Sequence, residues 1–129
     1  MKAALIAAAL IAVWGAVDSF QFESTANLRD PYMVNAQADR LAGVIQAIPR
    51  AAVVGYLSDV HDGSTIALAM FNSARYTLAP RLLVEGTDRD LVLGDFAKPA
   101  DFAAIGRDHG LEVARDFGNG VVLFKRAAK

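Results

Sequence analysis

The stretch AAVVGYLSDVHDGSTIALAMFNSARYTLAPRLLVEG, residues Ala51–Gly86, decides the fold of this 129-residue chain. It predicts a strand over Ala51–Leu57, a polar turn, a helix over Thr65–Leu78 and a second strand over Arg81–Glu85. The strand ranges are short apolar runs, which are typical of strands buried on both faces, and the helix range repeats apolar residues at helical spacing. A strand, helix and strand of these lengths predict a right-handed crossover unit, whose functional loops lie at the carboxyl ends of its strands.

The flanking sequence extends this unit to a small α/β domain over residues 31–129. Asp30-Pro31 is typical of a helix start, and the helix is expected to continue over Tyr32–Ile48. The short link at residues 86–90 favours an antiparallel neighbour over Leu91–Leu93, because a parallel pair needs a longer crossover. The remaining predicted elements are a helix over Ala100–His109 and a hairpin of Leu111–Phe117 and Val121–Phe124 around Gly118-Asn119-Gly120. We therefore expect a three-layer α/β domain with a mixed sheet that ends in a β-hairpin.

The composition limits the function classes. With 129 residues, 54% of them hydrophobic, the chain has room for one compact domain. Its 13 basic and 14 acidic residues alternate along the sequence. This balance argues against a nucleic-acid partner, which would favour a basic face or stripe. The absence of cysteine excludes disulfides, zinc–thiolate sites and a cysteine nucleophile.

The amino-terminal segment Ala3–Val17 has fifteen residues without a charge and follows Lys2. It suits either a cleaved signal peptide or an uncleaved membrane anchor. Fifteen helical residues span only about 22 Å, less than the roughly 30 Å of a hydrocarbon core, although Phe20 and Phe22 can extend the apolar surface. The cleavage site is poor, since cutting after Ala16 would put a tryptophan where a small residue is wanted. We therefore favour a transmembrane anchor over residues 1–22, followed by a tether over residues 23–30.

The anchor carries features that suggest a partner helix. Ala4, Ala8 and Ala12 recur every four residues on one face, and small residues let helices approach closely in lipid. Trp14 is interpreted as an interfacial or partner-facing anchor residue. Because the positive end of such a segment stays inside, we expect a single-pass protein of the bacterial inner membrane. Its amino terminus would be cytoplasmic and its soluble domain periplasmic.

The loop after the first strand is the first candidate site. Asp59, His61 and Asp62 lie between a buried strand and a helix, where they could ligate a metal, act as acid and base, or join the helix end in binding an anion. The alternative is structural, with Asp62 or Ser64 capping the helix. We favour the structural alternative because a metal site needs a third or fourth ligand. The sequence thus predicts no metal, no cofactor and no catalytic residue.

Two further groups of residues are candidates. Arg75 and Arg81 flank the turn from helix to strand and could bind a phosphate or a carboxylate. Arginines near a helix end more often complement the helix dipole or form ordinary ion pairs, and we favour that role. Asp95, in Gly94-Asp95-Phe96, would lie at the same edge as Asp59 only if their two strands are parallel.

The motifs RYTLAPR at 75–81, LVLGDF at 91–96 and DFGNGVVLFKR at 116–126 carry a resemblance. On them, residues 51–126 resemble the soluble α/β domain of bacterial membrane glycosyltransferases of the dolichyl-phosphate-mannose-utilising type, and of small single-span companions of those enzymes. This chain departs from the enzymes, because it has one possible span and lacks their catalytic acidic loop between membrane helices. The resemblance therefore implies no catalytic residue here. It implies an envelope domain that accompanies a membrane machine.

Together these observations predict a non-enzymatic accessory subunit of an integral membrane protein complex, attached to the lipid bilayer by its first segment. The alternative from another class is an envelope domain that binds a sugar or phosphate ligand, with or without catalysis. Its ligand would contact Asp59, His61, Asp62, Arg75 and Arg81. A third alternative, a secreted ligand-binding protein, would require cleavage of the first segment.

Overall fold

The computed structural model describes residues 2–28, 30, 34–60 and 63–128, with side chains described from residue 6 to 21, at residue 30 and through the last two of these ranges. The chain divides into two compact units, Met1–Pro31 and Tyr32–Lys129.

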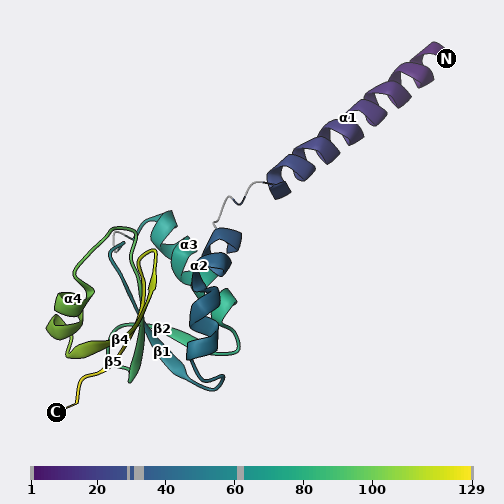
Figure 1. The fold of residues 1–129 in the computed structure, drawn as a ribbon. Helices are drawn as coiled ribbons and strands as arrows, with labels where there is room; N and C mark the ends of the chain where they lie inside the picture. The colour runs from purple at the N-terminus through teal and green to yellow at the C-terminus, as the bar shows by residue number, and fades with distance from the viewer. Residues whose placement is uncertain (1, 29, 31–33, 61–62, 129) are drawn as a thin grey trace. The chain divides into compact units, whose positions relative to one another are not determined.

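The first unit is built around one long helix, α1, over Lys2–Leu28 (Figure 1). The helix continues past the apolar segment, through Asp18 and into the range expected to be a tether. In the part of the chain that the structure describes, no helix is both long enough and apolar enough to cross a membrane. The transmembrane part of the sequence prediction therefore has no support from the structure.

The second unit is an α/β domain whose elements follow the predicted order. The predicted helix over Thr65–Leu78 is confirmed as α3 with the same bounds, and it begins where the Ser64 hydroxyl accepts a bond from the Ala67 amide at 3.2 Å. The other elements are α2 (Val34–Ala47), β1 (Val53–Ser58), β2 (Leu82–Glu85), β3 (Leu91–Asp95), α4 (Phe102–Asp108), β4 (Leu111–Gly118) and β5 (Val121–Arg126).

The described strands form one mixed sheet in the order β2-β1-β3-β5-β4. Strand β1 pairs in parallel with both β2 and β3, and β5 pairs antiparallel with β3 and β4. The predicted parallel crossover, mixed sheet and final hairpin are confirmed. The hairpin turns at Gly118, Asn119 and Gly120, all with positive φ, the backbone region that glycine and asparagine tolerate best.

The expected antiparallel pairing of the second and third strands is wrong. Strands β2 and β3 lie on opposite sides of β1, so the link at residues 86–90 has to pass over that strand. It does so at Gly55, where a Cβ atom would collide with the Gly86 carbonyl oxygen. The same oxygen accepts a bond from the Tyr56 amide at 3.1 Å. A five-residue link can therefore join two parallel strands, because a residue without a side chain lets it lie close to the strand between them.

The sheet is covered by helices on both faces, as the predicted three-layer architecture requires. Helices α2 and α3 lie over one face and α4 over the other (Figure 1). Two clusters of buried side chains fill these two interfaces. The first comprises Leu41, Val44, Ile48, Val54, Tyr56, Ala74, Leu78, Leu83, Leu93, Val121 and Leu123. The second comprises Val92, Phe96, Leu111, Val122 and Phe124, with Phe102 and Ile105 of α4 packed against it.

Candidate functional site

The connections of the two central parallel strands diverge at their carboxyl ends. Strand β1 continues into α3 on one face of the sheet, whereas β3 continues into α4 on the other. Ser58 and Asp95, the last residues of β1 and β3, are register partners. In open α/β sheets, the crevice outside two strands whose connections diverge in this way is where ligands usually bind. The candidate site is therefore this edge of the sheet.

A cavity of about 740 Å³ lies at that edge. We call it the switch-point crevice. It lies between the start of α3, the loop from β3 to α4 and the tip of the final hairpin, and its size is ordinary for a small-molecule site. Its lining residues are Arg40, Val60, Ile66, Met70, Phe96, Ala97, Lys98, Pro99, Ala100, Phe102, Asp116, Gly118, Asn119 and Gly120.

The walls of the crevice are fastened by side chains that bond to the backbone of other segments. Nη2 of Arg40, on α2, donates to the carbonyl oxygens of Phe96 at 3.2 Å and Asn119 at 2.9 Å. The Asp59 carboxylate accepts from the amides of Ala97 at 2.8 Å and Lys98 at 3.1 Å. These contacts hold the β3–α4 loop between the hairpin tip and the end of β1. The crevice is therefore formed before any ligand enters it.

A buried carboxylate lies directly behind the crevice. Asp95 has no exposed surface, and its Oδ2 accepts hydrogen bonds from Gln37 Nε2 and, at 3.0 Å, from the Tyr56 hydroxyl. Its Oδ1 lies 2.9 Å from Nη2 of Arg40. That contact lacks the alignment of a hydrogen bond, so Oδ1 interacts with Arg40 only through the attraction of opposite charges. The ion pair offsets a carboxylate that would otherwise be costly to bury.

The buried cluster around Asp95 stabilises the fold and is poorly placed to react with a substrate. Burial first, and then the neighbouring Asp95 charge, raises the pKa of the Tyr56 hydroxyl above its usual value of 10.0. The tyrosine therefore stays protonated and donates its hydrogen bond across the physiological pH range. Because Asp95 is inaccessible, no substrate atom can reach it without displacing Arg40 or α2.

The predicted loop residues are only partly placed. Asp59 lies beside the crevice, where its oxygens bind backbone amides, which is a structural role. His61 and Asp62 lie outside the described residues. The expected cap of the following helix is provided by Ser64. In the ranges that the structure describes, no three histidine, aspartate or glutamate side chains are close enough together to hold a metal ion.

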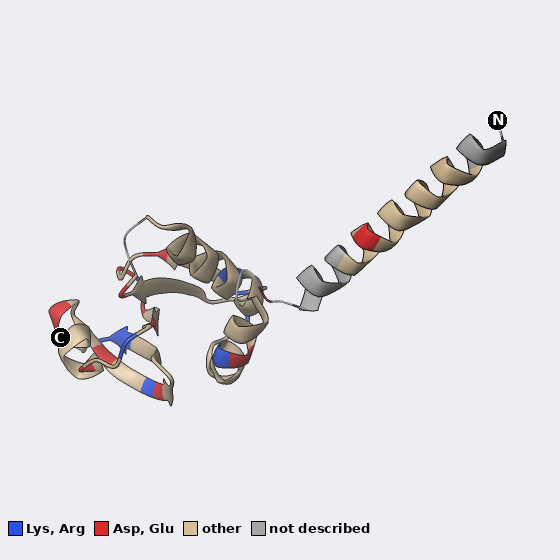
Figure 2. Cartoon of the chain, turned by 90° about the horizontal axis from the view of Figure 1, so that it is seen from above, with Lys and Arg blue, Asp and Glu red and all other residues tan. Residues whose placement is uncertain are grey.

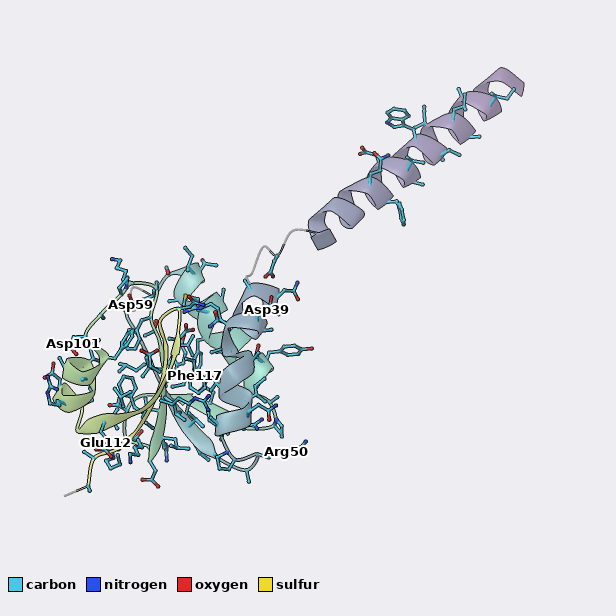
Figure 3. The ribbon with its side chains drawn as sticks, viewed as in Figure 1. Asp39, Arg50, Asp59, Asp101, Glu112 and Phe117 are labelled. Atoms are coloured by element: carbon cyan, nitrogen blue, oxygen red, sulfur yellow. The ribbon has the colours of Figure 1, made fainter. Side chains whose placement is uncertain are left out.

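The two predicted arginines lie away from that loop. Arg81 donates to the carbonyl oxygens of Ile48 at 2.8 Å and Ile45 at 2.6 Å, so it fastens the end of α2. It precedes β2, whereas Asp59 follows β1, and the parallel register separates them by roughly 20 Å along the sheet. Figure 3 labels Asp59 at one end of the domain and Arg50, near this fastening, at the other. The guanidinium of Arg75 lies 5.5 Å above the Phe71 ring. The three described residues of the ligand-binding alternative, Asp59, Arg75 and Arg81, are therefore not gathered at one site.

The predicted membrane or partner residues all lie in α1. Ala8 and Ala12 are one turn apart and exposed, and Trp14 is 77% exposed. The side chain of Ala4 lies outside what the structure describes. Between residues 6 and 21 the one charged residue is Asp18. In Figure 2 the rest of that stretch is uncharged, whereas acidic and basic residues are interspersed over the domain.

Sequence reasoning missed the residues that build the crevice. Ile66 is one of the apolar residues whose spacing predicts the helix over Thr65–Leu78, but it is 61% exposed and lines the crevice. Gln37 and Arg40 were passed over, although Gln37 lies four residues before Leu41 and so interrupts the buried stripe of α2. A polar residue on the apolar stripe of a helix is a signal that could have indicated a buried polar partner.

Comparisons with protein-family models, with curated proteins and with solved structures give no match for this chain. The resemblance to glycosyltransferase-associated domains stays a prediction.

Proposed function

We propose that this protein is a non-enzymatic accessory subunit that α1 attaches to a larger membrane complex, with the α/β domain on the periplasmic side. One observation carries the proposal, the exposure of large apolar side chains along α1. A helix with such a surface needs an apolar environment, either lipid or a partner protein. The exposed residues are Ile6, Leu10, Ile11, Val13, Trp14, Val17 and Phe20.

The distribution of residue sizes around α1 supports a partner helix. At 100° per residue, the larger side chains of residues 6–20 cover one half of the helix, from Phe20 round to Ile11, whereas Leu5 falls on the other half. Ala8, Ala12 and Gly15 cluster on the opposite half. In lipid, helices associate by packing, and small residues allow the closest approach. The small-residue half suits contact with another helix, and the large-residue half suits contact with acyl chains.

The short apolar length supports an accessory role. Fifteen uncharged helical residues reach about 22 Å, against roughly 30 Å for the hydrocarbon core. A neighbouring helix would shield the ends of such a segment from lipid. Lys2 before the segment places the amino terminus in the cytoplasm by the positive-inside rule. The domain then faces the periplasm.

Attachment is tested by carbonate extraction of native membranes, combined with mass spectrometry of the amino terminus. We expect the chain in the membrane pellet with Met1 present. Leu10→Arg should release it, because an arginine in mid-span costs about 2.5–3.5 kcal/mol on insertion scales. Val113→Arg, a matched change at an exposed apolar position of β4, should stay in the pellet. A processed chain that begins near Ala16 in the soluble fraction would refute attachment and favour the secreted alternative.

The partner contact is tested on the small-residue half of α1. Ala8→Phe should leave membrane attachment intact but separate the chain from its complex during purification in mild detergent. Leu10→Phe adds bulk on the opposite half and should co-purify as the wild type does. Equal recovery of the partner with both variants would exclude docking through Ala8 and move the contact to the domain.

A further inference from the structure

We propose that the switch-point crevice binds a small organic anion with an apolar or aromatic body. The site belongs to the α/β domain alone and does not depend on α1.

The apolar floor is the first indication of a ligand. Met70, Phe96 and Phe102 come from three different segments and meet in the lining, and the side chain of Ile66 stays 61% exposed beside them. Exposed isoleucines elsewhere on a surface need no explanation, but here the side chain faces a cavity at the edge where α/β sheets bind ligands. This floor suits a flat ring or a short branched chain.

The lining carries two basic side chains and one carboxylate, which favours an anion. Lys98 lies on the rim and has no ion-pair partner within the described ranges. Arg40 carries five N–H donors, and its contacts given above and one to Gln37 Oε1 at 3.2 Å involve only Nη1 and Nη2. The one lining carboxylate, Asp116, is engaged locally, since its Oδ1 accepts from the Gly118 amide at 2.8 Å. Asp95 offsets the charge of Arg40 from behind, so Lys98 supplies the attraction for an anion.

The walls need no rearrangement to accept this ligand. Arg40 and Asp59 hold the β3–α4 loop from opposite sides, and the Phe96 amide donates to the Gly120 carbonyl at 2.9 Å. Gly120 itself has no room for a Cβ atom, which would collide with the Phe96 carbonyl oxygen. A preformed cavity loses little conformational entropy on binding, which raises the affinity for a small ligand.

The experiment uses the full chain with methyl-labelled isoleucine and methionine. Three probes share one ring and differ in charge: phenylacetate, phenylacetamide and phenethylamine. We expect saturable shifts of the Ile66 and Met70 methyl signals with phenylacetate, weaker ones with the amide and none with the amine. The Ile48 methyl, in the opposite core cluster, serves as the internal control.

Two variants locate the binding. Lys98→Gln should weaken phenylacetate about two- to fivefold, the range for one exposed charge pair, and leave the amide unchanged. Lys125→Gln removes a lysine that pairs with Glu112 on the sheet and should have no effect. Ala100→Trp, at an exposed lining position, should abolish binding of both probes. Equal binding of the three probes, or no shift at Ile66 and Met70 at millimolar concentration, would overturn the proposal.

Discussion

Arg40 and Arg81 both join segments by donating to backbone carbonyl oxygens, yet they do different work. Arg81 fastens the end of α2 at the amino edge of the sheet and meets only carbonyl oxygens. Arg40 fastens the hairpin tip at the carboxyl edge, but it also faces a buried carboxylate and lines a cavity. Arg40 therefore belongs to a candidate site because a buried carboxylate and a cavity lie beside it, whereas Arg81 is bound to backbone oxygens. Sequence position drew attention to Arg81, which has the simpler role.

The largest expected effect is at the carboxyl edge. Asp95→Ala should lower the free energy of unfolding by about 3–5 kcal/mol, because it leaves Gln37 and Tyr56 without their shared acceptor and Arg40 without its ion-pair partner. Asp95→Asn keeps the shape and one acceptor oxygen, so its loss should be clearly smaller. Urea unfolding followed by circular dichroism measures both. Equal losses would mean that the charge of Asp95 contributes nothing and that Arg40 resembles Arg81 after all.

The second-largest loss of stability is expected where residues 86–90 cross β1. Gly55→Ala should cost about 1–3 kcal/mol, since its Cβ atom displaces the Gly86 carbonyl from β1. Val53→Ala, a change on the same face of β1 at an exposed position, should stay within about 0.5 kcal/mol. Thermal unfolding of the two variants checks the difference. A Gly55→Ala protein as stable as the wild type would contradict the crossing at this residue.

At the amino edge a smaller loss is expected. Arg81→Ala should cost about 1.5 kcal/mol through two lost bonds to the end of α2. It should leave phenylacetate binding in the crevice unchanged. Arg75→Ala, which loses only an exposed contact above the Phe71 ring, should cost less. Altered crevice binding in Arg81→Ala would show that the two edges are coupled.

The smallest effect is an alkaline one, from the Tyr56 hydroxyl beside Asp95. Its pKa is raised in the folded chain, so above pH 10 the unfolded chain releases this proton while the folded chain keeps it. The contribution of this hydroxyl to the free energy of unfolding is therefore fully present below pH 10. It declines above pH 10, by about 0.8 kcal/mol at pH 10.5. Tyr56→Phe should remove that part of the decline, whereas Tyr76→Phe, at an exposed position, should not. An unchanged decline in Tyr56→Phe would contradict the raised pKa.

Local sequence patterns predict the elements of the α/β domain and their order. The bounds of α3, the hairpin turn and the buried stripe of Leu41, Val44 and Ile48 follow from local rules of spacing, capping and glycine backbone freedom. These rules act between residues that are near in the chain, so one sequence is enough to apply them. The apolar character of α1 can also be predicted in this way, because it depends only on which residues the segment contains.

Contacts between residues far apart in the chain fix which strands are neighbours and which side chains meet at the strand ends. The passage of residues 86–90 over β1 depends on Gly55, which lies 31 positions before Gly86, and no local pattern encodes that contact. Asp95 meets Gln37 and Arg40 from across the domain for the same reason. A carboxylate at the end of a strand is costly if unpaired and harmless if paired, so its role depends on distant partners. The switch-point crevice likewise exists because β1 and β3 send their connections to opposite faces, which only the assembled sheet determines.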